Sequence, residues 1–481
     1  MNLLSSSALV LAATAAVYGQ HTVPSRPPSG AGLVNDWLRE RDPHANKWDV
    51  GGQFRVRYEA REHLAVAGVP GAIDFRAHGA PTHDNDYWLF RTKLHMGYSP
   101  LSWLRVYVEG RDSFSEGDER VPNLESDRAD LHQAYVALGD TKQSPLLAKV
   151  GRQELAYGDE RLMSSFDWNN IARVFDAAKL RFEHEKFWVD GFAGRVVVPD
   201  DNNFNEPNNH DWFWGAYGGT KALVPKAETQ LYFLGRNASA EAAGPDPGAL
   251  IPLPTERDIY SVGTRVKSLP GQLKGWDYGA EVVYQFGEFR ETNTGPELDQ
   301  DAWAAHVMGG YTFASAPASP RVGLEYNFSS GDADPTDGRH QTLDNLFPTN
   351  HKFYGYMDLF SWQNIHNPRI NLTLKPAKGL TLTVDYHLFW LADTADYFYQ
   401  ANGNPRRGGA AGAGYDRNQG HDNFVGSEID VIVTYAPKPY LNLQAGYGHF
   451  FVGDYVEQSL GSPAFGSSDA DWLYLQAAFN F

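Results

Sequence analysis

The stretch that decides the fold is Trp48–Ala60, WDVGGQFRVRYEA. In an extended conformation, one face of this stretch carries polar or charged side chains and the other carries apolar ones: Asp49, Gln53, Arg55, Arg57 and Glu59 against Val50, Phe54, Val56 and Tyr58. Alternation with a period of two is typical of a β-strand that separates a polar from an apolar environment.

The same alternation recurs along the rest of the chain. It predicts further strands near residues 86–98, 103–113, 129–139, 146–154, 174–183, 187–197, 212–223, 226–236, 257–267, 276–288, 302–314, 320–329, 367–376, 379–391, 426–437, 440–452 and 470–481. Short turns and long loops alternate between these strands, a pattern that a soluble β-sandwich has no reason to follow. We therefore predict an all-β fold: a transmembrane antiparallel β-barrel of about 18 strands, with short periplasmic turns and long outer loops.

The overall composition excludes other classes of protein. The 481 residues carry a formal net charge of −18, which argues against nucleic acid as a partner. Beyond the N-terminus no apolar run is long enough for a membrane-spanning helix, which excludes a helical membrane protein. The chain has no Cys, as suits export through an oxidising compartment.

The N-terminal segment looks like a targeting sequence. Leu9–Val17 is a short apolar core followed by small residues, which predicts a signal peptide over residues 1–20, although no Lys or Arg precedes it. An ordinary buried helix is the alternative. Residues 21–47 are rich in Pro and polar residues and are expected to form a leader, so the barrel is predicted over residues 48–481.

The C-terminus carries a second targeting feature. The terminal residue Phe481 shares one strand face with apolar residues, Leu473, Leu475, Ala477 and Phe479, so this face is expected to meet outer-membrane lipid. A C-terminal aromatic residue on such a strand resembles the signal that outer-membrane insertion machinery reads. We therefore expect a multi-pass barrel in the bacterial outer membrane, with that machinery as a partner.

If the apolar faces meet lipid, the charged faces line a lumen. The inward cations concentrate in the first third of the wall: Arg55, Arg57, Arg91, Lys93, Arg105, Arg111, Lys179 and Arg181, with Arg265, Arg321 and Arg369 later. The inward acids concentrate in the last two thirds of the wall, and the set is Asp49, Glu59, Glu109, Glu183, Asp277, Glu281, Glu325, Asp385, Glu428 and Asp430. A cationic wall favours anions, and Arg suits carboxylates in particular. Alternatively, these charges pair across neighbouring strands and only hold the lumen open.

One long loop mixes cations, anions and aromatic side chains. The segment Gly151–Phe182, GRQELAYGDERLMSSFDWNNIARVFDAAKLRF, contains the end of one predicted strand, this loop and the start of the next strand. Such a mixture suits a surface that grips an ionic chain bearing rings. The alternative is that the charges pair with each other and hold the loop in shape.

Within this segment, GRQELAYGDERL and DWNNIARVFDAAKLRF resemble the alginate export family of bacterial outer-membrane channels, and PTNHKFYGYMD at 348–358 is also similar to it. The resemblance implies an eighteen-stranded barrel with a cationic constriction that passes an anionic polyuronate. On matching positions it implies two groups of site residues. Arg152, Arg161 and Arg173 would be cationic residues of the pore or its mouth, and Asp159, Glu160 and Asp167 their structural or selectivity partners.

Other constellations give weaker signals. Asp332, Asp334 and Asp337 in GDADPTDG resemble part of a calcium loop but lack its closing bidentate Glu. The His residues are scattered with no helical pair, so a zinc site is not expected. No Ser–His–Asp arrangement stands out. We therefore predict no metal, no cofactor and no catalytic residues.

Together these features predict a channel for anionic solutes. The expected cargo is an acidic polysaccharide such as alginate, or its oligomers, moving by passive diffusion along an Arg/Lys-lined pore. The alternative is a general or nutrient-uptake porin for small anions or sugars, and a third hypothesis is a barrel enzyme. The direction of transport and the oligomeric state stay open.

Overall fold

The computed structural model of the protein describes most of the chain. The described residues are 32–66, 72–78, 84–121, 123, 125–140, 143–242, 255–406, 415, 417, 419–461 and 466–481. The predicted signal peptide, residues 1–20, lies outside them, as does the first part of the predicted leader.

The described residues form a barrel wall of eighteen strands, and each stretch predicted from the alternation overlaps one of them. The strands are β1 Trp48–Glu62, β2 Asn85–Leu101, β3 Leu104–Glu116, β4 Asp127–Leu138, β5 Leu146–Gln153, β6 Phe175–Glu183, β7 Phe187–Val198, β8 Glu206–Thr220, β9 Ala227–Ala238, β10 Arg257–Ser268, β11 Trp276–Phe289, β12 Leu298–Thr312, β13 Arg321–Ser329, β15 Ile365–Ala377, β16 Leu380–Leu391, β17 Phe424–Lys438, β18 Leu441–Val452 and β19 Ala470–Asn480. A two-residue strand, β14 Arg339–His340, pairs in parallel with the start of β12.

Two strands begin four or more residues earlier than predicted. β8 begins at Glu206 rather than near 212, and β12 begins at Leu298 rather than near 302. The added residues, 206–211 in β8 and 298–301 in β12, are largely polar and break the alternation, so a search for alternating faces ends before them.

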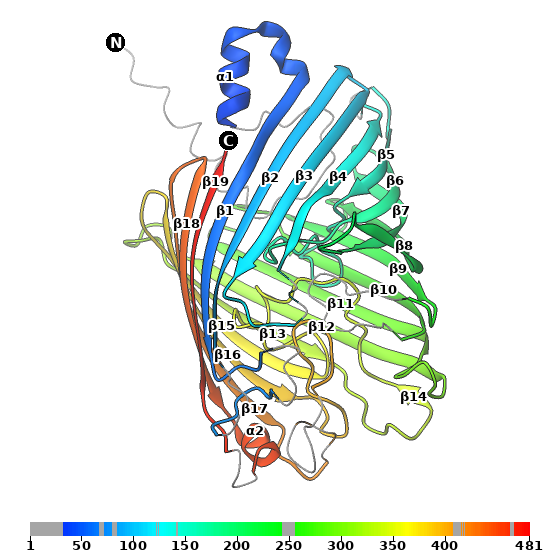
Figure 1. Ribbon diagram of the computed structural model, residues 1–481, viewed down its shortest axis with the longest axis vertical. Helices are drawn as coiled ribbons and strands as arrows, with labels where there is room; N and C mark the ends of the chain where they lie inside the picture. The colour runs from blue at the N-terminus through cyan, green and yellow to red at the C-terminus, as the bar shows by residue number, and fades with distance from the viewer. Residues whose placement is uncertain are drawn as a thin grey trace.

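The sheet closes on itself. Each strand of the wall pairs antiparallel with its neighbours in sequence, and β1 pairs with both β2 and β19 (Figure 1). The final residue completes the seam, because Phe481 and Gly52 exchange two backbone hydrogen bonds of 2.9 Å. Closure leaves no strand edge with unpaired backbone groups.

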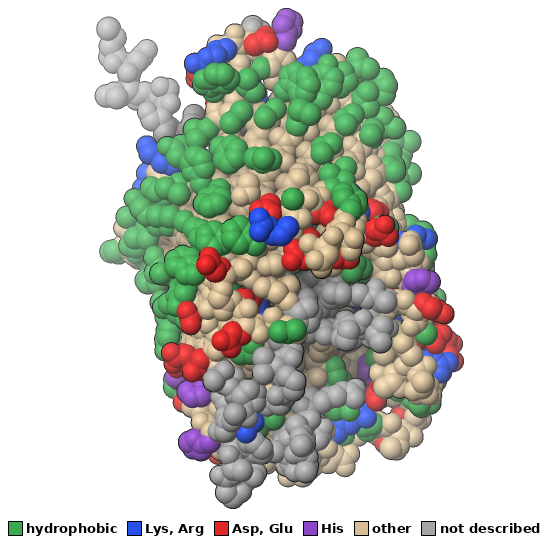
Figure 2. Space-filling model, viewed as in Figure 1, with side chains coloured by type: hydrophobic (Ala, Val, Ile, Leu, Met, Phe, Trp, Pro, Cys, Tyr) green, Lys and Arg blue, Asp and Glu red, His purple; other side chains and the backbone are tan. Residues whose placement is uncertain are grey.

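The outer face of the wall is apolar. Alternate residues such as Leu94, Val108, Val150, Leu180 and Leu324 are exposed although they belong to regular strands. Figure 2 shows hydrophobic side chains over much of the upper part of one face, while charged side chains gather lower down and at the top rim. This distribution matches the predicted apolar faces.

Both described helices lie at the ends of the barrel (Figure 1). Helix α1, Leu33–Arg41, and the 3₁₀ helix η1, Pro43–Lys47, occupy the second part of the predicted leader. Asn35 attaches α1 to β1, because its amide donates to Asp49 at 2.9 Å and its oxygen accepts from the Val50 N–H at 2.8 Å. Helix α2, Asp454–Ser459, lies at the opposite end. Neither described helix has the length and apolar character needed to span a membrane.

Two long connections fold into the barrel instead of staying outside. We call residues 154–174 the first lumen loop and residues 341–364 the second lumen loop. The loops pair with each other, since the Phe347 N–H donates to Leu162 O at 3.0 Å and the Ser164 N–H donates to Phe347 O at 2.8 Å. Their buried apolar side chains form one cluster with inward residues of the wall: Leu155, Leu162, Met163, Leu343, Phe347, Tyr354, Met357, Phe360 and Trp362 with Phe175, Phe213 and Phe389.

Candidate functional site

The predicted inward cations of the first strands do face the lumen. The alternating burial of β1, β2, β3 and β6 puts their side chains on the buried inner face, opposite the exposed apolar face: Arg55, Arg57, Arg91, Lys93, Arg105, Arg111, Lys179 and Arg181. β1, β2 and β6 each contribute two cations at i, i+2 and β3 contributes two that are six residues apart, because even spacings repeat one face of a strand. We call the side of the wall that carries these residues the cationic wall. Asp49, Glu59 and Glu109 share its inner face, so an anion path along it stays a prediction.

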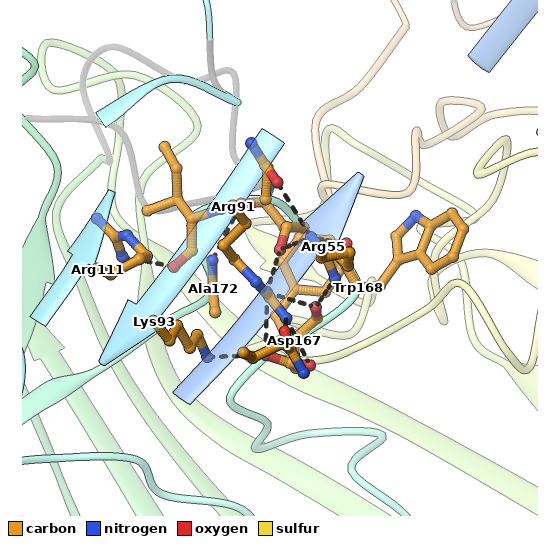
Figure 3. A network of polar contacts seen from close by, with 12 residues as sticks. Arg55, Arg91, Lys93, Arg111, Asp167, Trp168 and Ala172 are labelled. Atoms are coloured by element: carbon orange, nitrogen blue, oxygen red, sulfur yellow. Dashed lines mark hydrogen bonds and ion pairs between the residues drawn. The ribbon is translucent and has the colours of Figure 1, made fainter. Parts of the chain in front are cut away.

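The first lumen loop lies directly on this cationic wall (Figure 3). The Asp167 carboxylate lies 3.0 Å from both the Arg91 guanidinium and the Lys93 ammonium. The backbone carbonyl of the same residue accepts hydrogen bonds from Arg55 at 2.9 Å and from Arg91 at 3.1 Å. Wall cations thus bind both the side chain and the main chain of one loop residue.

Two further arginines extend these contacts along the loop. Arg57 donates to the Trp168 carbonyl at 2.8 Å, and its guanidinium lies over the indole ring at 3.9 Å from the ring centroid. Arg111 donates to the Ile171 carbonyl and forms a buried ion pair with Asp127. Carbonyl oxygens are weaker acceptors than carboxylates, so Asp167 supplies the main anionic charge that the loop brings to these cations.

Asp167 also remains open to the lumen. Its side chain is 55% exposed, whereas the side chain of Arg91 is almost completely buried. Partial removal from water opposes ionisation, but Arg91, Lys93 and Arg55 hold the pKa of the Asp167 carboxyl well below its usual range. An ionised carboxylate therefore sits on a cationic cradle with one side facing the lumen.

The three arginines implied by the family resemblance lie in three different places. Arg161 reaches across the lumen to an ion pair with Glu325 on β13, and hydrogen bonds of 3.0 and 2.9 Å join it to Asn327 and the Tyr354 hydroxyl. Arg173 donates to the backbone carbonyls of Ser164 and Pro348, one in each lumen loop. Both residues are buried and hold the loops together.

Arg152 lies on the outer face of the wall. It shares a face of β5 with the exposed residues Leu146 and Val150, while Lys149 is on the inner face. Its guanidinium pairs with Asp176 at 2.8 Å and donates to the Asn205 carbonyl at 2.9 Å. In this arrangement Arg152 fastens a connecting loop to the outside of the wall, away from the lumen.

The remaining predicted site residues are paired within the lumen. Asp159 binds Arg265 and Lys267, each at 2.6 Å, and these cations lower the pKa of the Asp159 carboxyl even though burial opposes this. Glu160 accepts a hydrogen bond from the Ser164 hydroxyl at 2.8 Å. The last two predicted cations also have acidic partners: Arg105 pairs with Asp49 at 2.8 Å and Arg181 with Asp190 at 2.6 Å. These charges therefore face the lumen and pair with each other, and the preference of the wall for anions stays a prediction.

Two further features of the lumen are not among the site residues predicted from the sequence. Lys149 belongs to the cationic wall, and its inward position follows from the alternation of β5. The second lumen loop contributes Lys352, which lies 3.5 Å from Glu160, and His351, which stacks on Trp168 at 3.8 Å between ring centroids. The second lumen loop has more apolar residues than an exposed loop usually has, and this feature of the sequence indicates that it packs inside the barrel.

The described residues contain no group of three or more His, Cys, Asp or Glu side chains placed to hold a metal ion. The lumen instead offers ionic and aromatic contacts, which suit binding and guiding a charged solute.

Comparison with known proteins identifies the family. The model of the alginate export family matches residues 47–464. This chain belongs to the alginate export family. Among curated proteins no sequence matches it.

Solved structures agree on the fold of this alginate export family member. OpdQ of Pseudomonas aeruginosa has a TM-score of 0.55 and 12% identity, over 90% of this chain and 97% of that one. OccK11 (OpdR) of the same organism has a TM-score of 0.53 and 13% identity, over 90% and 96% of the two chains. OccK2 (OpdF), solved in complex with glucuronate, has a TM-score of 0.54 and 12% identity, over 90% and 98%. At these identities the likeness concerns the fold alone.

Family membership and the closed eighteen-stranded wall together establish the general nature of the protein. It is a multi-pass β-barrel of the bacterial outer membrane, and the barrel forms a channel.

Proposed function

We propose that this channel passes anionic solutes, and that its cargo is an acidic polysaccharide such as alginate or its oligomers. Movement is passive diffusion along the cationic side of the lumen. Membership of the alginate export family supports a polyuronate cargo. Arg and Lys side chains along the wall supply the positive field that such a cargo requires.

The observation that carries this proposal is the position of Asp167. The chain's own carboxylate occupies a cradle formed by Arg91 and Lys93, and half of that carboxylate side chain faces the lumen. A uronate residue presents the same chemical group. Geometry that holds an aspartate carboxylate on two cations can hold a sugar carboxylate beside it or in its place.

A second candidate is uptake of small sugar acids. It is favoured by the extent to which the two lumen loops fill the barrel, and by the likeness in fold to OccK2, which was solved in complex with glucuronate. Flux into liposomes separates the two candidates. Passage of uronate oligomers supports a polymer channel, whereas passage of glucuronate alone supports an uptake porin.

Ion selectivity tests the cationic path. We expect the reversal potential of the native barrel, measured in a planar bilayer under a salt gradient, to show a preference for anions. Lys93→Gln should reduce this preference because it removes a lumenal cation, and Asp167→Asn should increase it because it frees Arg91 and Lys93. Arg339→Gln is the matched control, since Arg339 is 54% exposed on the short strand β14, in the connection between β13 and β15. A cation preference in the native barrel, or equal reversal potentials in the two lumenal variants, contradicts the proposal.

A further inference from the structure

Two lysines of the wall face each other without a balancing acid of their own. Lys149 on β5 lies directly opposite Lys179 on β6, and both are on the inner face. Like charges directly opposite each other destabilise a pair of strands. Such an arrangement therefore needs either a shared anion or a functional reason.

The acid nearest to this pair is already engaged. Lys179 lies 3.7 Å from Asp190, but Arg181 binds the same carboxylate at 2.6 and 3.0 Å, and the Tyr157 hydroxyl donates to it at 2.6 Å. For Lys149, no carboxylate of the described residues lies within the 4.0 Å limit of an ion pair. Its ammonium instead lies over the Tyr135 ring, 3.7 Å from the centroid.

This pair differs from the cations around the first lumen loop. Arg91 and Lys93 share the carboxylate of Asp167, and Arg265 and Lys267 share that of Asp159. The loop thus brings one carboxylate to each of these two pairs of wall cations. Lys149 and Lys179 are a third pair, to which no carboxylate of the loop is joined by an ion pair among the described residues.

Aromatic rings flank the lysine pair on both sides. Tyr135 stacks on Tyr107 with 5.1 Å between ring centroids, and Lys179 lies 5.6 Å from the ring of Tyr157, which stacks on Tyr217 at 4.7 Å. Tyr135 is only half-buried. A pyranose ring has an apolar C–H face that packs on such rings, so cations between aromatic side chains suit a sugar acid better than a simple inorganic anion.

The position of the pair fits an entry site. Lys149 lies three residues after the start of β5, which follows the short turn after β4, and Lys179 lies four residues before the end of β6, which leads into the next short turn. Short turns and both chain ends mark the periplasmic end of such a barrel. The lysines therefore lie between that end and the cradle that holds Asp167.

We propose that Lys149 and Lys179, with the ring of Tyr135, form a carboxylate-binding subsite for a sugar acid in the periplasmic half of the lumen. The two ammonium groups bind the carboxylate, and the tyrosine ring packs against the sugar. This proposal rests on the proposed passage of anionic sugars, and it adds the place where a sugar unit is held before it reaches the first lumen loop.

Current block by defined oligomers tests the subsite. The probes are trigalacturonate, its methyl ester and inorganic phosphate, each added to the full-length barrel in a planar bilayer. Trigalacturonate should block the native current. The double variant Lys149→Gln with Lys179→Gln should need a concentration of trigalacturonate about tenfold higher for the same block, a change of about 1.4 kcal/mol in binding free energy, because the carboxylate loses both charged partners. The Lys149→Arg, Lys179→Arg variant should retain native block, as should the control Arg128→Gln, which lies in an exposed pair outside the lumen.

Tyr135→Leu distinguishes the contribution of the sugar ring from that of the carboxylate charge, because it removes the aromatic ring and keeps both lysines. It should weaken block by trigalacturonate, and it should leave any effect of phosphate unchanged. Folding of each variant is checked by its circular dichroism and by its open-channel current, and the single variant Lys149→Gln serves if the double variant does not insert.

Each possible result is decisive. If trigalacturonate blocks the glutamine variants at the same concentration as the native barrel, the subsite is overturned and the proposed function stands. Absence of block in the native barrel overturns both. Block by phosphate as strong as that by trigalacturonate, with no effect of Tyr135→Leu, overturns the assignment to a sugar acid.

Discussion

Arg161, in the first lumen loop, is bound to Glu325 on β13, 164 residues away in the sequence. β13 lies nearly opposite β5 and β6 in the closed sheet, so the first lumen loop crosses the lumen to make this ion pair. Glu325 also pairs with Arg369 at 3.3 Å, which joins the loop to two strands of the far wall. The loop is therefore fixed at both sides of the barrel.

Removal of Arg161 should release the loop from the far wall. Arg161→Met leaves Glu325 buried with one partner fewer, and breaking a buried ion pair costs about 3–5 kcal/mol. We expect a lower thermal midpoint, read from the heat-induced shift in gel mobility, and a larger open-channel current. Arg339→Met is the control because exposed pairs contribute about 0–1 kcal/mol. Equal midpoints for both variants would show that the pair does not hold the loop.

A glycine in the second lumen loop should tolerate no side chain. Gly355 has a φ of +90°, and a Cβ there would overlap the carboxylate of Glu428, which accepts a hydrogen bond from the Met357 N–H at 3.0 Å. Gly355→Ala should therefore displace the loop and make the current noisier. Gly338→Ala is a matched control, since Gly338 has a φ of +85° and open space around it. The backbone strain is the same in both, so only the steric clash distinguishes them.

The strands could be predicted from the sequence because the side-chain pattern of each strand depends only on the environment of its own two faces. Water or lumenal charges on one side and lipid on the other impose a period of two, as in Val50 to Glu59 of β1. Closure of the wall and the inward position of Arg91 or Lys93 follow from the same pattern. The register of each pair of strands then needs only the short turns.

The path inside the barrel could not be predicted in the same way. Whether Arg91 stays free or binds Asp167 depends on how a loop folds, and no periodic pattern encodes that. Arg152 is an example. Its place in a family motif suggested a position in the pore, whereas it lies two residues after Val150 on β5 and therefore shares the outer face of that strand. At this position the alternation of side chains along the strand predicts the location better than the family motif does, because alternation is a geometric constraint of the wall.

The packing of an outer connection should depend on pH through Asp332. This residue lies between β13 and β14 and is 1% exposed; burial and the neighbouring Asp396 raise the pKa of Asp332 from 3.8 to about 6. The folded loop therefore favours the protonated acid. The stability of the folded loop should therefore fall as the pH rises from 3.8 to about 6, and it should stay lower above pH 6.

Proteolysis of the outer connections measures this effect. Cleavage of the native barrel should be slower at pH 5 than at pH 7.5. Asp332→Asn mimics the protonated acid, so it should slow cleavage at pH 7.5 and reduce the difference between the two values. A native barrel that is cleaved faster at pH 5 would contradict the sign of this prediction.

Phe347 is the joint between the two lumen loops. Its backbone pairs with Leu162 and Ser164, and its ring packs edge-on against Phe175 and Phe213 of the wall, with centroids 5.2 and 4.9 Å apart. Phe347→Ala keeps the backbone pairing but opens a cavity, which costs about 3–5 kcal/mol in a well-packed core. Because both loops rest on this ring, we expect a lower thermal midpoint together with a larger and more variable current. Phe313→Ala, at a 48% exposed site near a short turn, should change neither quantity. A lower midpoint with an unchanged current would mean that the ring stabilises the wall but does not hold the loops in the lumen.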